Sequence, residues 1–147
     1  MQITQILAKL VAEALESSQA TSVLPAAGAV DIKIERPKLA EHGDFSTSLP
    51  LTLARTMRLP PIQIASAIVD AMPQDEIIGS VSIAAPGFVN FTLSTHWLQS
   101  QVNIVRCLGE KFGTVNSGLG KSVQVEFVSV NPTGPLHVGH ARGAVIG

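Results

Sequence analysis

The apolar residues of this chain change between a helical and a strand-like spacing, and the order of these changes restricts the fold more than any other feature. At the start the spacing is helical, because apolar side chains recur at intervals of three and four residues. They are Ile3, Ile6, Leu7, Leu10, Val11, Ala14 and Leu15. Such a stripe occupies one side of a helix, so we expect an amphipathic helix that ends near Ser17 and Ser18.

Three later segments alternate apolar and polar residues, which is typical of strands with one buried face. The first is 30–35, followed by Pro37, and the other two are 80–85 and 88–93 with a Pro86-Gly87 turn between them. In the last segment Val89, Phe91 and Leu93 share one face, and Phe88, Asn90 and Thr92 share the other. The two adjacent segments predict an antiparallel hairpin.

Helical spacing returns between and after these strands. The string His42-Gly43-Asp44 predicts a turn and helix cap, and Ser48 is a plausible N-cap for a helix that ends near Met57. A further helix follows Pro60-Pro61, and a last one begins after Ser94. The order αβααββα predicts an α+β fold, a small antiparallel sheet with helices over one face.

The pattern changes after residue 112. Residues 113–120 are rich in Gly, Ser and Asn, as in a linker. The run 123–128 has the β-branched and aromatic character of a buried parallel strand, and a turn-rich segment then leads to a helix that begins at Val138. A strand, a glycine-containing turn and a helix start together resemble the opening of a Rossmann-like α/β domain.

Three parts are therefore expected. Residues 1–112 form the first domain, 113–120 the linker, and 121–147 the truncated beginning of a nucleotide-binding domain.

Composition excludes several classes of protein. Ten Lys and Arg stand against eleven Asp and Glu, so the net charge of −1 predicts no broad electrostatic surface for nucleic acid or anionic lipid. Any RNA contact must be local. The one cysteine, Cys107, excludes an internal disulfide or a thiolate metal cluster. No segment approaches the ~20 apolar residues of a membrane span, and the N-terminus lacks an export signal, so we expect a cytoplasmic protein.

The string His137-Val138-Gly139-His140 follows the predicted strand and opens the predicted helix. The free N–H groups and the dipole at a helix N-terminus favour phosphate. Gly139 lets a flat base or ribose approach the backbone. The two imidazoles can donate hydrogen bonds to phosphate oxygens whose charge grows during attack on the α-phosphate. No further Cys or His-rich segment completes a metal site, so none is expected.

Residues 125–147, VEFVSVNPTGPLHVGHARGAVIG, closely resemble the start of the catalytic domain of bacterial arginyl-tRNA synthetases. In that family Asn-Pro-Thr-Gly-Pro-Leu leads into the His-Ile-Gly-His signature of class I synthetases, here with Val138 in place of Ile. Three earlier strings resemble landmarks of the additional N-terminal domain of this family. They are Glu35-Arg36-Pro37, His42-Gly43-Asp44-Phe45 and Pro86-Gly87-Phe88-Val89-Asn90-Phe91. Ser48 is a departure, since the family favours Asn there.

The resemblance implies roles for particular residues. His137 and His140 would be catalytic, and ATP would contact Pro135, His137, Gly139 and His140. Ser129 and Asn131 would hold the α-amino and carboxylate groups of arginine, and His140 would bind near arginine as well. Mg²⁺ would come with the nucleotide. Phe88 and Asn90, on the less apolar face of their strand, would contact tRNA(Arg) by stacking on an unpaired base and hydrogen-bonding to its edge.

The implied function is that of an arginine–tRNA ligase, which forms arginyl-adenylate and then transfers arginine to its tRNA. The parent would be a monomer that needs tRNA even for the first step. The sequence holds no Lys-Met-Ser-Lys-like string, so this segment alone should be inactive. Two alternatives stay open. One is a tRNA-independent nucleotidyltransferase that shares the His-x-Gly-His turn, and the other is a free-standing RNA-binding module derived from the N-terminal domain.

Overall fold

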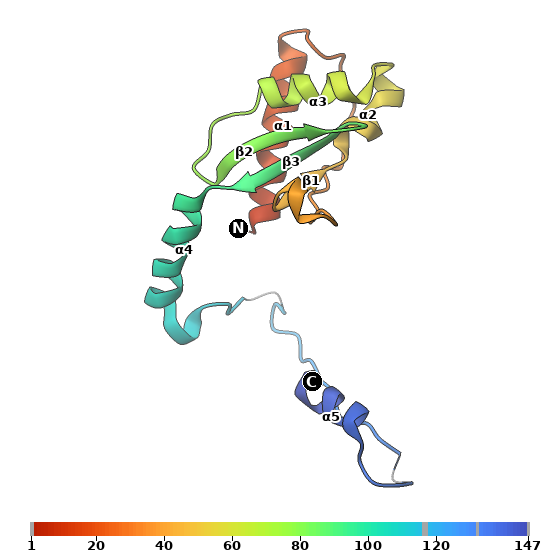
Figure 1. Ribbon diagram of the computed structural model, residues 1–147, viewed down its shortest axis with the longest axis vertical. Coiled ribbons are helices and arrows are strands. Elements are labelled where there is room, and N and C mark those ends of the chain that lie inside the picture. Colours follow the sequence, from red (N-terminus) through yellow and green to blue (C-terminus); the bar gives the residue numbers. More distant parts are fainter. Residues whose placement is uncertain (1, 116–117, 132, 147) are drawn as a thin grey trace. The chain divides into compact units, whose positions relative to one another are not determined.

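The computed structural model describes residues 2–115, 118–131 and 133–146. The described residues form five α-helices, two short 3-10 helices and a three-stranded antiparallel sheet (Figure 1). The chain divides into two compact units, Met1–Gly109 and Glu110–Gly147. The first unit is the α+β fold that the sequence predicts.

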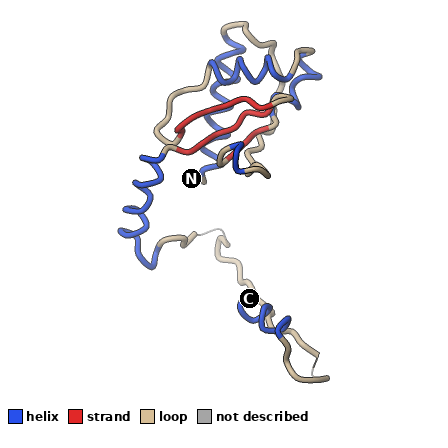
Figure 2. The backbone as a smooth tube through the Cα atoms, viewed as in Figure 1, coloured by secondary structure: helices blue, strands red, loops and turns tan. Residues whose placement is uncertain are grey.

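The sheet has the order β1-β3-β2, with β1 (Phe45–Thr47) and β2 (Ile78–Ala84) on either side of β3 (Phe88–Leu93) (Figure 2). Both pairings are antiparallel, and Phe91 lies opposite Phe45 on one side and Val81 on the other. The hairpin predicted across Pro86-Gly87 is therefore confirmed. The register places apolar residues of all three strands on one face and Ser46, Asn90 and Ser82 on the other.

Three helices pack on the apolar face. They are α1 (Ile3–Ala20), α2 (Leu49–Met57) and α3 (Pro61–Asp70). The core joins their apolar stripes to the sheet; its fully buried members include Leu7, Val11, Ile64, Ile68, Val89 and Phe91. Burial of these stripes is the main stabilising contribution, at roughly 25 cal/mol per Å² of apolar area.

The helix α4 (Thr95–Leu108) forms as predicted but does not cover the sheet. Ser94 caps it, because its hydroxyl oxygen accepts a hydrogen bond from the backbone N–H of Trp97 at 3.3 Å. Only Trp97, in the first turn, packs against the core, and no residue of α4 is buried. The helix continues from the end of β3 away from the sheet, so its later turns lie beyond the core (Figure 1). The 3-10 helix η2 (Gly109–Lys111) follows.

The strand predicted at 30–35 is wrong. Only Glu35 pairs, in an isolated bridge with Ser46, where the two backbone N–H···O distances are 2.9 and 2.8 Å. The edge strand β1 is three residues long, so it offers the extended segment too few partners for a ladder. Ile32 and Ile34 nevertheless place their side chains against the core, which accounts for the alternation in the sequence.

Asp44 caps a strand rather than a helix. A 3-10 helix, η1 (Ala40–His42), leads into Gly43, whose φ of +84° suits glycine. The Asp44 carboxylate accepts a hydrogen bond from the N–H of Leu93 at 2.8 Å, and its own N–H donates to Phe91 O. Ser48 does occupy the N-cap position of α2, but its side chain makes no cap bond there. Instead Thr47 Oγ1 accepts from the Leu49 N–H.

In the second unit the predicted strand at 123–128 is not formed. These residues have no regular secondary structure, and Val123, Val125 and Phe127 are exposed. A parallel strand needs a neighbour for its backbone N–H and C=O groups, and no described residue pairs with this segment. The predicted helix is present as α5 (Val138–Ile146). Residues 113–115 and 118–120, in the predicted linker, contain neither helix nor strand.

Among the helices of the described ranges, none has both the length and the apolar character needed to cross a membrane.

Candidate functional sites

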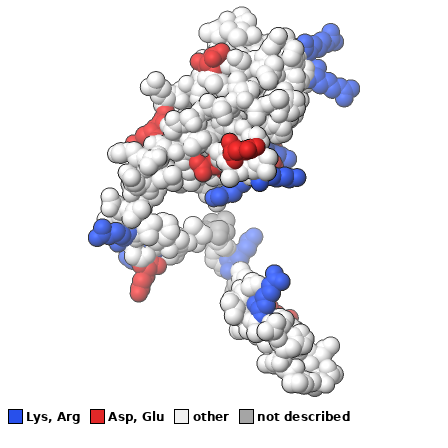
Figure 3. Space-filling view, in the orientation of Figure 1, with Lys and Arg blue, Asp and Glu red and all other residues white. Residues whose placement is uncertain are grey.

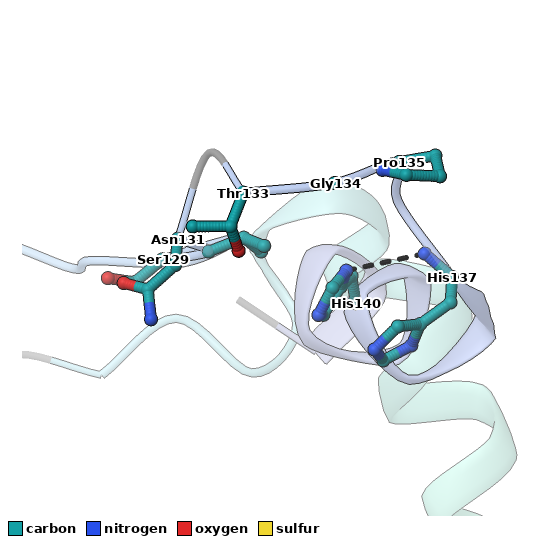
Figure 4. A pocket seen from close by; sticks show the side chains of 8 residues that line it. Ser129, Asn131, Thr133, Gly134, Pro135, His137 and His140 are labelled. Atoms are coloured by element: carbon teal, nitrogen blue, oxygen red, sulfur yellow. Dashed lines mark hydrogen bonds between the residues drawn. The ribbon is translucent and has the colours of Figure 1, made fainter.

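The second unit contains a hollow of about 430 Å³ in front of the first turn of α5 (Figure 4). It is lined by Ser129, Val130, Asn131, Thr133, Gly134, Pro135, His137 and His140. Five of the six residues that the resemblance assigns to ATP and arginine thus lie around one hollow. The sixth, Gly139, lies beneath a histidine: a Cβ built on it would be 3.0 Å from Cε1 of His137.

The two histidines cap the helix together. His137 precedes the first residue of α5, and its Nδ1 accepts a hydrogen bond from the N–H of Gly139 at 3.1 Å. In return, Nδ1 of His140 accepts from the N–H of His137 at 3.3 Å. This exchange is the arrangement of a capping box, in which the residue before the helix and the third helical residue satisfy N–H groups of the first turn.

The cap decides which ring nitrogen can donate. A neutral imidazole carries one N–H, so a ring whose Nδ1 accepts must carry its proton on Nε2. The rings are stacked, with centroids 3.5 Å apart and an interplanar angle of 29°. Each histidine therefore keeps an Nε2–H donor that the cap does not use. His137 is exposed and His140 half-buried.

Ser129 and Asn131 lie on the opposite side of this hollow (Figure 4). The Ser129 hydroxyl donates to a carboxylate oxygen of Glu126. Sequence reasoning missed Glu126. Glu126 is the acidic residue of the run 123–128, and a charge in a buried strand is costly unless it has a partner or a function.

A second hollow, of about 420 Å³, lies in the first unit on the sheet face away from the helices. Its lining comprises Glu35, Arg36, Pro37, Lys38, His42, Ser46, Ala84, Ala85, Phe88 and Asn90. The structure thus brings the predicted pair Phe88 and Asn90 into one hollow. Both side chains are less exposed there than they would be on an uncovered sheet face. Phe88 is half-buried and Asn90 is 4 % exposed.

The side-chain amide of Asn90 belongs to the lining of this hollow and is almost wholly covered. Among the described residues, no side-chain nitrogen or oxygen is both fully buried and without a hydrogen-bond partner. Within the same described ranges, no three His, Cys, Asp or Glu side chains group as they would around a metal ion.

A family model shows which protein family this chain belongs to. The model of the arginyl tRNA synthetase N terminal domain matches residues 3–93. The chain belongs to the arginyl-tRNA synthetase family. The match covers the whole of the sheet and the three helices packed on it.

Synthetases of known sequence match beyond that domain. The arginine–tRNA ligase of Dehalococcoides mccartyi (strain CBDB1) is 42 % identical over 145 residues, which are 99 % of this chain and 26 % of the relative. The enzyme of Nitrosomonas europaea is 45 % identical over 128 residues, 87 % of this chain and 22 % of that protein. The chain thus spans about a quarter of the length of the curated relatives it matches.

Solved synthetase structures have the same fold. The Thermus thermophilus arginyl-tRNA synthetase matches with a TM-score of 0.55 and 25 % identity, over 99 % of this chain and 22 % of that one. The Plasmodium falciparum enzyme matches with a TM-score of 0.58 over 68 % of this chain and 17 % of that one. At 10 % identity the latter likeness concerns the fold alone.

Proposed function

We propose that this chain is the N-terminal part of an arginine–tRNA ligase, which joins arginine to ATP as an adenylate, releases pyrophosphate and transfers the arginyl group to tRNA(Arg). The observation that carries the proposal is the hollow at the start of α5, where Pro135, His137 and His140 lie opposite Ser129 and Asn131. Membership of the synthetase family supports it. By the same resemblance, the ligase acts in the cytoplasm as a monomer.

The paired histidines are the groups we assign to ATP. When the arginine carboxylate attacks the α-phosphorus, negative charge builds on the non-bridging oxygens of the α-phosphate and then on the departing pyrophosphate. The Nε2–H donors of His137 and His140, together with the positive end of the α5 dipole, stabilise that charge. By the same resemblance, Mg²⁺ would be carried on the triphosphate.

Ser129 and Asn131 are assigned to arginine. The amide of Asn131 offers both a donor and an acceptor for its α-carboxylate and α-amino groups. The Ser129 hydroxyl is held by Glu126, whose carboxylate adds a negative charge on the side where an ammonium group would bind. His140, in the same hollow, lies where arginine and ATP would meet.

We further propose that residues 121–147 begin a Rossmann-like nucleotide-binding domain, joined through the linker 113–120 to an N-terminal domain of residues 1–112. In this proposal the run 123–128 becomes a parallel strand when neighbouring strands satisfy its backbone. The N-terminal domain contacts tRNA(Arg) through Phe88 and Asn90, with an unpaired base stacked on the ring and hydrogen-bonded to the amide.

ATP–pyrophosphate exchange tests the proposal in a ligase of full family length that contains this segment. We expect arginine-dependent exchange that requires tRNA(Arg). Exchange without tRNA would instead support the tRNA-independent nucleotidyltransferase. RNA binding with no exchange, and with a reading frame that stops after Gly147, would support the free-standing RNA-binding module.

A further inference from the structure

The hollow that holds Phe88 and Asn90 also gathers basic side chains that base recognition leaves without a role. Its floor consists of uncharged residues of the sheet, Ser46, Phe88 and Asn90. Its rim is the segment Glu35–Lys38 together with His42. This segment is held in place by the two backbone hydrogen bonds between Glu35 and Ser46, so the rim and the floor form one local structure.

Two full positive charges belong to this rim, on Arg36 and Lys38, and both side chains are exposed. The Arg36 guanidinium lies over the Phe45 ring, with 5.4 Å between its Cζ atom and the ring centroid. A cation–π contact of this kind limits where the side chain points. Glu35 contributes one opposing charge, so the lining has a net charge of +1 with His42 neutral.

The positive charge of the lining is small, and outside it the Glu41 carboxylate lies 4.0 Å from Nε2 of His42. The whole chain has a net charge of −1, and on the face drawn in Figure 3 basic and acidic side chains are dispersed rather than gathered into a large basic surface. Phosphate contacts must therefore be few and local. The Phe88 ring, the Asn90 amide and two cations around a hollow of about 420 Å³ match the base face, the base edge and the phosphate of one nucleotide.

We propose that Arg36 and Lys38 bind the phosphates flanking the unpaired nucleotide whose base lies on Phe88 and Asn90. This inference rests on the proposed tRNA contact and adds the groups that bind the backbone. The rim positions the RNA by charge, while the floor distinguishes the base. His42, half-buried in the same lining, offers a further polar contact to the ribose or phosphate.

The salt dependence of binding to a tRNA(Arg) transcript tests this inference, since each phosphate contact on a single strand contributes about 0.7 to the slope of log affinity against log salt. The double variant Arg36→Gln/Lys38→Gln keeps the aliphatic stems but loses both charges. Between about 50 mM and about 200 mM salt, the 147-residue chain should lose roughly sevenfold more affinity than this variant. Lys33→Gln is the matched control, because Lys33 lies just before the segment Glu35–Lys38 but lines a different hollow, beside α1.

The outcomes distinguish the proposed phosphate contacts of Arg36 and Lys38 from the proposed tRNA contact of Phe88 and Asn90. A double variant with an unchanged slope, or a Lys33→Gln control that lowers the slope equally, overturns the assignment of the rim. The Phe88→Ala/Asn90→Ala variant should lower affinity at every salt concentration without changing the slope, because it removes no charge. If the parent chain does not bind the transcript even at low salt, the proposed tRNA contact itself fails.

Discussion

The backbone N–H of His137 donates to Nδ1 of His140 at 3.3 Å, so the second histidine of the signature completes the cap that the first one begins. One pair of side chains thereby does two things. It satisfies N–H groups at the start of α5, and it leaves the ring proton of each neutral imidazole on Nε2.

Asn and Gln substitutions separate these two roles. His137→Asn keeps a good N-cap residue and His140→Gln keeps an acceptor at the third helical position, but both replace the imidazole Nε2–H with an amide N–H in a different position. In a full-length ligase we expect tRNA-dependent pyrophosphate exchange to fall by about 10²- to 10³-fold for each. Amide hydrogen exchange at Gly139 should change little, which shows that the cap persists. If ATP–pyrophosphate exchange stays near normal in either variant, the imidazole of that residue is not needed for the reaction.

Gly139 tests how closely the backbone supports the rings. An added Cβ would lie 3.0 Å from Cε1 and 3.1 Å from Nδ1 of His137, so Gly139→Ala shifts that imidazole by a few tenths of an ångström. Displacement of a catalytic group by ~1 Å can lower a rate up to about 100-fold, and for this smaller shift we expect a loss of about tenfold or less in pyrophosphate exchange. Gly143→Ala, also on α5, meets nothing within 4 Å and should retain activity. Equal activity of the two variants would contradict the contact.

Asp44 joins the turn before β1 to the end of β3, and its loss should be visible in stability alone. Asp44→Ala removes the acceptor for the Leu93 N–H and leaves that group without its partner. We expect unfolding to become easier by about 1–2 kcal/mol, and the melting temperature of the chain to fall by several degrees. Asp31→Ala, at an exposed site of the neighbouring segment, provides the control. A melting temperature unchanged by Asp44→Ala would mean that water replaces the carboxylate without cost.

The spacing of apolar residues was sufficient to predict an element where that element is long and its backbone hydrogen bonds lie within one helix or one hairpin. The helix over Ile3–Ala20 and the hairpin strands β2 and β3 follow directly from apolar spacing. It failed at 30–35, because a strand exists only if a neighbour pairs with it, and alternation reports burial rather than pairing. The run 123–128 likewise has no strand partner among the described residues, as expected for a lone parallel strand. The three residues of β1 are too few to show any period.

The two candidate sites differ in whether their residues are close together in the sequence. The residues around His137 lie within a dozen positions of one another, so a local string could predict that they meet. The contributions of Arg36, Lys38 and His42 to the hollow beside Phe88 depend on a contact between segments about fifty residues apart. Only the bridge between Glu35 and Ser46 and the pairing of β1 with β3 bring them together, and neither is visible in residue spacing.

The 147-residue chain alone should not form arginyl-tRNA. In its second unit the run 123–128 is exposed and has no strand partner among the described residues, so the hollow before α5 has no sheet to hold it in a fixed geometry. Effective catalysis depends on reacting groups held to within a fraction of an ångström. The measurement is the transfer of labelled arginine to a tRNA(Arg) transcript, with a ligase of full family length as the positive control. Arginyl-tRNA made by the purified chain, and abolished by His140→Gln, would show that these residues assemble a working site without the rest of the nucleotide-binding domain.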